Sequence, residues 1–456
     1  GNGEIVFRVS DIFSGVAACV SAVERREKKM SLRGKGKNTG GAWRRKTPVI
    51  YVLAVIFLTI LFFSNDFGLV DIQKTAIVLA VGIDRENGEF IVNSRIAVPS
   101  ASGDQKAAAE SIQVETRGGT VGAAIQEINT KTGRYPKLVF LNLIVLGETA
   151  TEKNAFETID YFLRNDYMSD DCNVCCCEGK AGELLDTQTT VEKIPSLAIG
   201  KILSDHSATT GLAAVTSLRE FAAGYFGSSK SGYMPLLKAA ELSGDEEKSG
   251  SSGADSSGSS DSSGSGGAGG SESGSGGSGS GAGGESEGKT FTATETALFS
   301  EGVYKGRLTK DETFAFLCVN GGVRLATFDV EYGGVNYTLT IKKSDGRIKF
   351  SVDDFAAPRL SVTLNVIAGL QDVSSSQTIV EIAAPEKTKQ AVLEEAAKKL
   401  DRLVKSTFEK SRAHGCDIFG AERRLQKFES AYYNAYRENL LERVLFYTDV
   451  KFSAAS

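Results

Sequence analysis

Histidine is nearly absent from the 456-residue chain, in which His206 and His414 are the only two. Two residues are too few for a histidine-rich metal centre, and they limit histidine-based acid–base catalysis. The net charge of −5 is small. No basic face with interleaved aromatic residues follows residue 64, so we expect no nucleic acid as a partner.

Long apolar runs are also scarce, because residues 48–64 form the only one. This run reaches the short end of the about 17–25 residues that a membrane-spanning helix needs. Arg44, Arg45 and Lys46 precede it, so the positive-inside rule keeps the amino-terminal side in the cytoplasm. Its exit lacks a small-residue cleavage site and a nearby cysteine, which favours an uncleaved anchor over a cleaved signal peptide. We therefore predict that residues 48–64 cross the lipid bilayer and that the larger carboxy-terminal part lies outside it.

Residues 1–29 differ from the basic stretch that follows them. Met30 opens residues 30–47, which we interpret as a short cytoplasmic tail. Arg25, Arg26 and Glu27 can be encoded by a purine run that resembles a bacterial ribosome-binding site. Our hypothesis is that Met30 is the true start and that residues 1–29 are a non-native leader. A natural product whose amino-terminal sequence begins upstream of Met30 would refute this hypothesis.

Residues 243–289 are almost wholly Gly, Ser, Ala, Asp and Glu. With no apolar side chain larger than Ala, this stretch cannot offset its ordering entropy, so we predict a disordered linker. As a flexible coil it would span roughly 40 Å. It divides the exported region into two folded parts, residues 70–242 and residues 290–452.

The part at 70–242 alternates strand and helix patterns. The apolar run 75–84 predicts a buried strand, and Asn87-Gly88 predicts a hairpin turn to a partner strand at 89–98. Further patterns predict helices at 120–131 and 155–164, strands at 138–146 and 173–177, and a largely helical stretch at 197–226. This alternation predicts a mixed α/β domain.

The part at 290–452 begins with strands and continues with helices. Short or alternating apolar patterns predict strands at 296–304, 314–319, 323–331, 335–342, 347–352, 360–367 and 444–452. Tight turns are expected at Gly333-Gly334 and at 344–346. Helical spacing predicts a long helix at 386–414 and another at 421–444. We therefore predict an α+β domain in which a long helix covers an antiparallel sheet.

Seven cysteines are an odd count, and Cys172, Cys175, Cys176 and Cys177 are packed together. Exported disulfide frameworks usually carry an even number spread through a small domain. A metal site usually needs a second pair of ligands, and a redox CxxC normally opens a helix rather than a strand. We interpret the four as buried structural thiols, with an oxidation-sensitive or metal-binding cluster as the alternative.

No catalytic constellation is visible in the sequence. The carboxylates that could do acid–base work read as solvated turn residues: Asp84, Glu148, Asp160, Asp166, Asp170 and Asp171. The Gly-Gly pairs lack the strand-to-helix setting of a phosphate loop, and no serine has a Gly-x-Ser-x-Gly context. We predict no catalytic, cofactor-binding or metal-ligating residues.

An aromatic stripe marks the helix predicted at 421–444. Such a stripe usually packs in a core, but tyrosine is also favoured at interfaces. Tyr432, Tyr433 and Tyr436 are therefore candidate partner-interface residues.

Several segments follow one another in an order that resembles a known family. They are AIVLAVGIDRENGEFIVNSRIAVPS, TVGAAIQEINTKTGRYPKLVFLNLIVLGE, DYFLRND and CNVCCCEGKAGELL, then ALFSEGVYKGRLTKDETFAFL, CDIFGAERRLQKF and YTDVKF. Their order and spacing resemble the C subunits of spore germination receptors, the Ger(x)C or GerAC-like family. The resemblance covers most of residues 70–452.

The resemblance implies a non-enzymatic accessory (C) subunit of a nutrient germinant receptor. Such a subunit would sit on the outer face of the spore inner membrane and assemble with A-type and B-type membrane subunits. C subunits are usually anchored by a lipidated cysteine, which residues 66–71 lack. The sequence therefore departs from the family in its anchor but keeps the expected outer-face placement. The alternatives are a membrane-anchored cell-envelope binding protein and a carboxylate-dependent cell-wall hydrolase.

Overall fold

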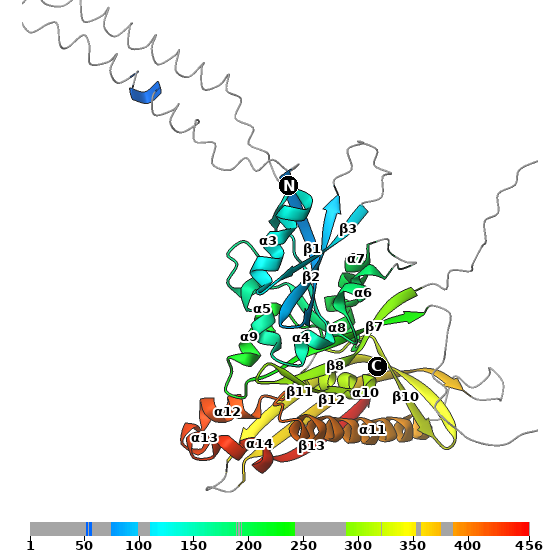
Figure 1. Cartoon of the computed structure of the whole chain (residues 1–456). Helices are drawn as coiled ribbons and strands as arrows, with labels where there is room; N and C mark the ends of the chain where they lie inside the picture. Colours follow the sequence, from blue (N-terminus) through cyan, green and yellow to red (C-terminus); the bar gives the residue numbers. More distant parts are fainter. Residues whose placement is uncertain are drawn as a thin grey trace, which may run out of the picture. The chain divides into compact units, whose positions relative to one another are not determined.

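The computed structural model describes residues 52, 54–56, 74–98, 110–187, 189, 192, 194–241, 289–320, 322–352, 357–374 and 386–455. Within residues 71–456 the described segments form one compact unit that contains two sheets (Figure 1). The predicted anchor at 48–64 lies almost entirely outside the described residues, and so do Arg44, Arg45 and Lys46. Among the helices that are described, none is long and apolar enough to cross a membrane.

The first sheet is mixed, and nine strands of it are described. Its strand order is β3-β2-β1-β5-β6-β7-β8-β9, and β4 also pairs with β1. Parallel pairing joins β1, β5, β6 and β7, whereas β2, β3, β8 and β9 add antiparallel pairs at the two sides. The strands are β1 (Thr75–Glu86), β2 (Glu89–Val98), β3 (Glu110–Gly118), β4 (Tyr135–Lys137), β5 (Leu143–Leu146), β6 (Asn173–Cys177), β7 (Ser231–Glu241), β8 (Lys289–Ser300) and β9 (Val303–Leu308).

Local sequence signals formed the first elements as predicted. β1 and β2 make a hairpin whose turn residues Asn87 and Gly88 have φ values of 51° and 88°, as a primed turn requires. Helix α3 (Val121–Thr132) begins where the Thr120 side chain accepts a hydrogen bond from Ala123 N, and it ends at Gly133 with φ 67°.

Helices cover both faces of this sheet. Buried residues of α3, α5 (Ala155–Leu163) and α9 (Leu218–Tyr225) share one core, while those of α6 (Ala181–Asp186) and α7 (Pro195–Ile202) share the other. Short helices α4 (Glu148–Thr151) and α8 (Asp205–Thr209) lie in connections. The stretch predicted as largely helical at 197–226 is divided into α7, α8 and α9, because Gly211 adopts φ 74° and Ser217 starts α9 with a capping box.

The Gly/Ser-rich tract connects two strands of one hairpin. β7 and β8 pair in antiparallel register from Ser231 opposite Ser300 to Glu241 opposite Lys289. Strands from both sides of the tract therefore belong to the same sheet. The predicted disorder of 243–289 falls mainly on residues outside the described part, and the division into parts 70–242 and 290–452 stays a prediction.

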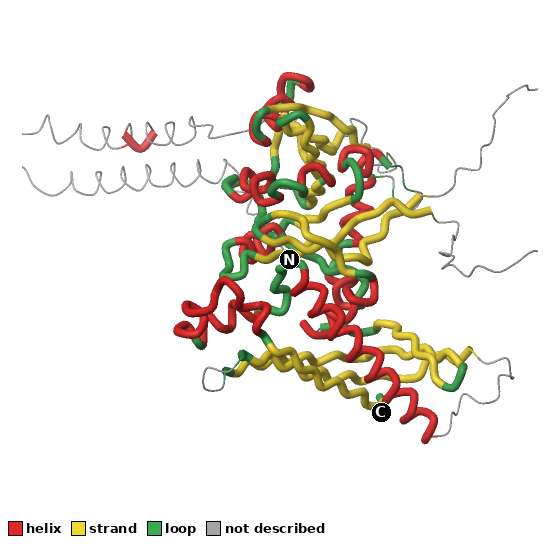
Figure 2. The backbone as a smooth tube through the Cα atoms, turned by 60° about the horizontal axis from the view of Figure 1, so that its bottom comes forward, coloured by secondary structure: helices red, strands yellow, loops and turns green. Residues whose placement is uncertain are grey.

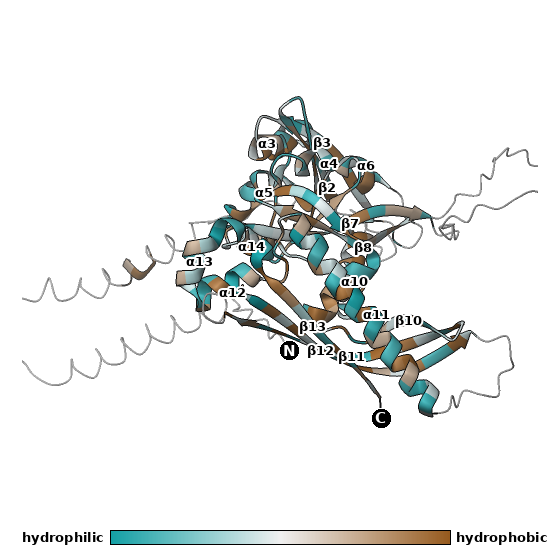
Figure 3. Ribbon diagram, turned by 90° about the horizontal axis from the view of Figure 1, so that it is seen from below, coloured by the Kyte–Doolittle hydropathy of each residue, from teal (hydrophilic) through white to brown (hydrophobic). Residues whose placement is uncertain are grey.

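The second sheet has the order β10-β11-β12-β13, and α11 (Glu386–Ala413) lies across it (Figure 2). Its strands are β10 (Ala326–Tyr332), β11 (Val335–Ser351), β12 (Arg359–Ser374) and β13 (Leu445–Ala454). β12 and β13 are parallel, so the sheet is mixed and the prediction of an antiparallel sheet was wrong for its last strand. Hydrophilic and hydrophobic residues alternate along its strands (Figure 3), and Leu339, Val362 and Leu364 pack with Val404 and Phe408 of α11.

Three further predictions for this part were wrong. Residues 314–319 belong to helix α10 (Lys310–Asn320), because Thr309 and Glu312 form reciprocal cap hydrogen bonds. The expected turn at 344–346 lies inside β11, which continues through a register shift. The helix expected at 421–444 is broken into α12 (Ala421–Phe428), α13 (Ser430–Tyr436), η2 (Arg437–Asn439) and α14 (Leu440–Arg443).

Candidate functional site

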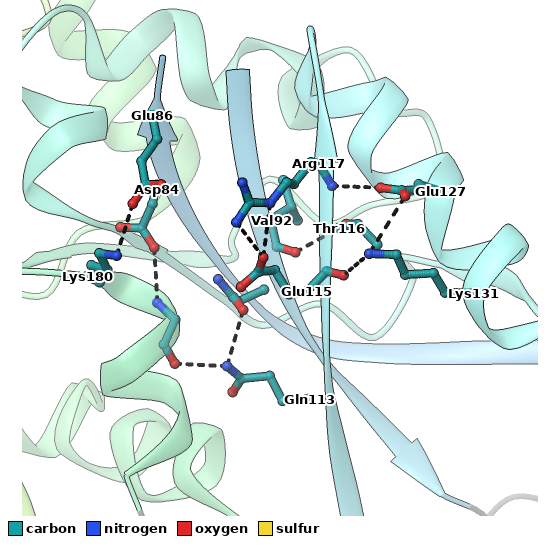
Figure 4. A network of polar contacts seen from close by, with 12 residues as sticks. Asp84, Glu86, Val92, Gln113, Glu115, Thr116, Arg117, Glu127, Lys131 and Lys180 are labelled. Carbon is teal, nitrogen blue, oxygen red and sulfur yellow. Dashed lines mark hydrogen bonds and ion pairs between the residues drawn. The ribbon is translucent and has the colours of Figure 1, made fainter. Parts of the chain in front are cut away.

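A polar cleft of about 230 Å³ lies where β1, β2 and β3 meet α6 (Figure 4). Five carboxylates and two cations line it, together with two side-chain amides. The residues are Asp84, Glu86, Ile91, Asn93, Gln113, Glu115, Arg117, Lys180, Gly182, Glu183 and Asp186. Charged side chains from several elements of the first sheet converge in this cleft.

Asp84 is the buried carboxylate of this cleft, with 3% of its surface exposed. Its carboxylate accepts hydrogen bonds from Ala181 N at 3.0 Å and Gly182 N at 3.2 Å, at the start of α6. Burial raises the pKa of Asp84, whereas the two N–H groups and Lys180 act in the opposite direction. A β-carbon on Gly147 would overlap Asp84 Oδ1, so a glycine is needed beside it. Asp84 thus fastens α6 to β1.

Side-chain amides continue this attachment. Gln113 Nε2 donates to Gly182 O at 2.9 Å and to Asn93 Oδ1 at 3.3 Å, and Asn93 is 5% exposed. Among the described residues Gln113 Oε1 has no hydrogen-bond partner. Sequence reasoning missed both amides. The signal for Asn93 was a polar residue within the strand 89–98, but its burial depends on α6 arriving from elsewhere in the chain.

The rim of the cleft is made of ion pairs. Lys180 Nζ lies 3.0 Å from Glu86 Oε1, and Arg117 Nη2 lies 3.0 Å from Glu115 Oε1. These side chains are largely exposed, so each pair contributes little stability. Asp84 is bound to backbone N–H groups, and Glu86, Glu115 and Asp186 are in ion pairs, so the cleft serves to hold α6 on the sheet.

The other predicted carboxylates are not brought into one site. Glu148 Oε2 accepts from Gly179 N at 3.2 Å, which holds the turn before α6. Asp160 pairs with Arg164 at 2.8 Å, Asp170 and Asp171 both pair with Arg219, and Asp166 is exposed. These contacts organise turns and helix ends and form no acid–base pair.

The cysteine cluster lies in the core of the first sheet. Cys172 and Cys176 pack with α3, α5 and α9, while Cys175 and Cys177 pack with α6 and α7, so successive side chains of β6 point to opposite faces as predicted. Burial raises the pKa of Cys172 and of Cys176 to about 12 and also raises the pKa of Cys175 and Cys177. No group of three or more metal-ligating side chains occurs among the described residues.

The three candidate tyrosines belong to a small separate core. Tyr432 is 5% exposed and packs with Leu425 and Leu440, and its ring centroid lies 4.7 Å from that of Tyr436. Tyr433 and Tyr436 are half-buried at the edge of this core. Phe428 of the same region is 67% exposed. The structure therefore assigns Tyr432 to packing and leaves the other two rings partly accessible.

Two family models match the chain. The one described as "Spore germination protein N-terminal domain" matches residues 69–239, and "Spore germination B3/ GerAC like, C-terminal" matches residues 294–454. No curated protein sequence matches the chain. A solved structure titled "Crystal Structure of the GerBC protein" is similar at 14% identity and a TM-score of 0.46, covering 82% of this chain and 97% of that one.

Proposed function

The chain belongs to the GerAC-like family of spore germination proteins, the C subunits of germinant receptors, and from this premise we propose how it acts. It works without bond-making chemistry, as a membrane-anchored accessory subunit that assembles with A-type and B-type membrane subunits. The observation that carries the proposal is the pair of family matches. They follow in the expected order on the two sides of the Gly/Ser-rich tract and cover most of residues 69–454.

The way the two sheets are joined supports an assembly role. β8 and β9 are strands of the first sheet. Their residues Leu298 and Leu308 nevertheless pack in the hydrophobic core of the second sheet. Asp417 N donates to Ser231 Oγ at 2.9 Å, which links the loop after α11 to β7. A unit tied in this way can present surfaces at a constant spacing to two partners.

The polar chemistry of the described part supports a non-enzymatic role. Asp84 and Glu148 bind backbone N–H groups, and the predicted carboxylates of the helix ends pair with arginines. Carboxylates used in this way are not free to act as a general acid and base. The family itself is a receptor-subunit family.

The location follows from the sequence and stays a proposal. Residues 48–64 would anchor the chain in the spore inner membrane, with the amino terminus in the cytoplasm and the folded unit on the outer face. For the partner surface we propose the exposed side of α12 to α14, where Tyr433, Tyr436 and Phe428 remain accessible. Tyr432 supports that surface from beneath.

A capture experiment tests this function. The tagged full chain is purified in detergent from spore inner membranes, and co-purified proteins are identified by mass spectrometry. Recovery of two multi-pass membrane proteins is expected. Recovery of a folded chain without either would overturn assembly as its role and would favour a cell-envelope binding protein. A carboxylate-dependent hydrolase would instead release fragments from purified peptidoglycan.

A further inference from the structure

Four large apolar side chains are unusually exposed around the start of the first sheet. Tyr135 is 59% exposed, Val139 53%, Phe140 59% and Tyr167 80%. We call these four residues the aromatic edge. Single exposed apolar residues are normal on a protein surface, but a cluster that includes three aromatic rings indicates a contact surface.

Tyr135 lies on β4, and Val139 and Phe140 lie in the turn that follows it. β4 runs parallel to β1, and Tyr135 lies opposite Thr75, the first residue of β1. Tyr135 and Lys137 project to the same side of β4, because side chains alternate along a strand. Lys137 Nζ lies 6.0 Å from the ring centroid of Tyr167, which precedes β6. Val139 and Phe140 follow Lys137 directly, in the turn that leads to β5.

The exposed side chains are held by ordered turns. Leu141 N donates to Leu138 O at 2.9 Å, and both of these leucines are buried, so Val139 and Phe140 form the tip of a turn between two anchored ends. Tyr167 N donates to the side chain of Asn165 at 3.0 Å. Hydrogen-bonded turns therefore hold these side chains at the surface, and their exposure does not come from loose packing.

Three cationic residues are sequence neighbours of the aromatic edge or of Thr75, which pairs with Tyr135. Lys74 and Lys137 are exposed and Arg134 is half-buried, while Asp166 is the acidic residue next to Tyr167. Aromatic rings beside lysine and arginine are the composition of surfaces that lie in the headgroup region of a membrane. A soluble protein partner would give no specific reason for aromatic rings and cationic side chains to lie together on this surface.

Chain length places a membrane within reach of this surface. The apolar run 48–64 ends ten residues before Lys74, so the covalent connection can span at most about 35 Å. β1 begins at Thr75, opposite Tyr135 in the sheet. The point at which the chain enters the folded unit and the aromatic edge are thus neighbours.

We propose that the aromatic edge is a second membrane contact, which lies in the headgroup region of the bilayer that anchors residues 48–64. Phe140 and Tyr135 enter the interface, while Lys137 and Arg134 meet lipid phosphates. This contact orients the folded unit on the membrane and so sets the direction in which α12 to α14 point. The inference rests on the anchoring in the proposed function and adds a defined orientation to it.

Tryptophan fluorescence in vesicles tests the contact. Trp43 is the only tryptophan in the chain, so a Trp43→Phe background allows one new probe at a time. Phe140→Trp and Tyr167→Trp report on the aromatic edge. Phe428→Trp is the matched control, because Phe428 is similarly exposed but belongs to α12, at the opposite end of the folded unit from α3 in Figure 1.

Each full-length variant is reconstituted in phosphatidylethanolamine–phosphatidylglycerol vesicles, with or without lipids brominated near the headgroup end of their acyl chains. A side chain about 5–10 Å into the interface lies near these bromines, so quenching should be at least about two-fold stronger at the aromatic edge than in the control. Equal, weak quenching at all three positions in vesicle-bound protein would overturn the inference and leave a protein as the occupant, with the proposed function intact. Failure of the full chain to float with vesicles would overturn the anchor and this inference together.

Discussion

Gly346 supports the contact between α10 and the second sheet. It lies in β11 opposite Leu364 of β12, in a stretch that the sequence predicted to be a turn. A β-carbon at this position would overlap the carbonyl oxygen of Val319 and come within 2.7 Å of its carbonyl carbon. Val319 is buried in the last turn of α10. The helix end therefore rests directly on a strand that has no side chain at this point.

Replacing Gly346 with alanine should destabilise the protein. The added methyl group would meet backbone atoms, which no rotamer change can move aside, so α10 must shift away from β11. Overpacking of this kind costs typically about 1–3 kcal/mol. Gly200→Ala is the matched control, because Gly200 lies in α7 and has open space around its missing β-carbon. There the same change should stabilise the protein by up to about 1 kcal/mol through helix propensity.

Urea unfolding of the detergent-solubilised full chain, followed by circular dichroism, measures both variants against the parent. We expect the midpoint to fall for Gly346→Ala and to rise or stay level for Gly200→Ala. A Gly346→Ala midpoint at or above that of the parent would refute the contact between α10 and β11. An equal loss in both variants would show that the cost comes from glycine replacement in general.

Three further predictions concern other parts of the fold. Tyr432→Ala should lower the free energy of unfolding by about 3–5 kcal/mol because its ring is buried. Tyr433→Ala should mainly weaken the capture of partner proteins. Equal melting temperatures for the two variants would contradict this difference between packing and contact. Burial and the neighbouring Asp417 raise the pKa of Glu422 from 4.5 to about 7, so the folded state binds this proton more tightly than the unfolded chain and stability should fall as pH rises from about 4.5 to 7. Glu422→Gln should flatten that fall in a pH series of urea midpoints, and an unchanged slope would count against it. The six described cysteines are buried, so in a Cys19→Ser background a thiol-reactive dye at pH 8 should label the chain only after unfolding. Rapid labelling of this native variant would refute the inertness of the six thiols.

Elements with short-range signals were predictable. The β1–β2 hairpin depends on Asn87 and Gly88, and α3 depends on Thr120 and Gly133, all of which act on the backbone within a few residues. Helix α10 carried the same kind of signal in Thr309 and Glu312. It was missed because the apolar residues 314–319 are buried all round and show no helical face.

The candidate site was less predictable than the fold. Asp84 was interpreted as a solvated turn residue, which was wrong: it is 3% exposed, and its partners Ala181 and Gly182 are almost a hundred residues away. The aromatic edge was not predicted, since exposure of Phe140 depends on which neighbours pack beside it. Tyr432 and Tyr433 are adjacent in the same stripe, yet the structure buries one and leaves the other partly accessible.

The sequence by itself determined the family, the alternation of strands and helices, and the alternation of the cysteines along β6. These follow from periodicity and from the order of motifs, which are properties of neighbouring residues. Only the tertiary structure decided that strands on both sides of the Gly/Ser-rich tract share one sheet, that β13 runs parallel to β12, and that a strand passes under the end of α10 at Gly346. Those outcomes depend on contacts between segments that are far apart in the sequence. Such contacts stabilise the structure only when the segments pack against each other, so local sequence patterns do not reveal them.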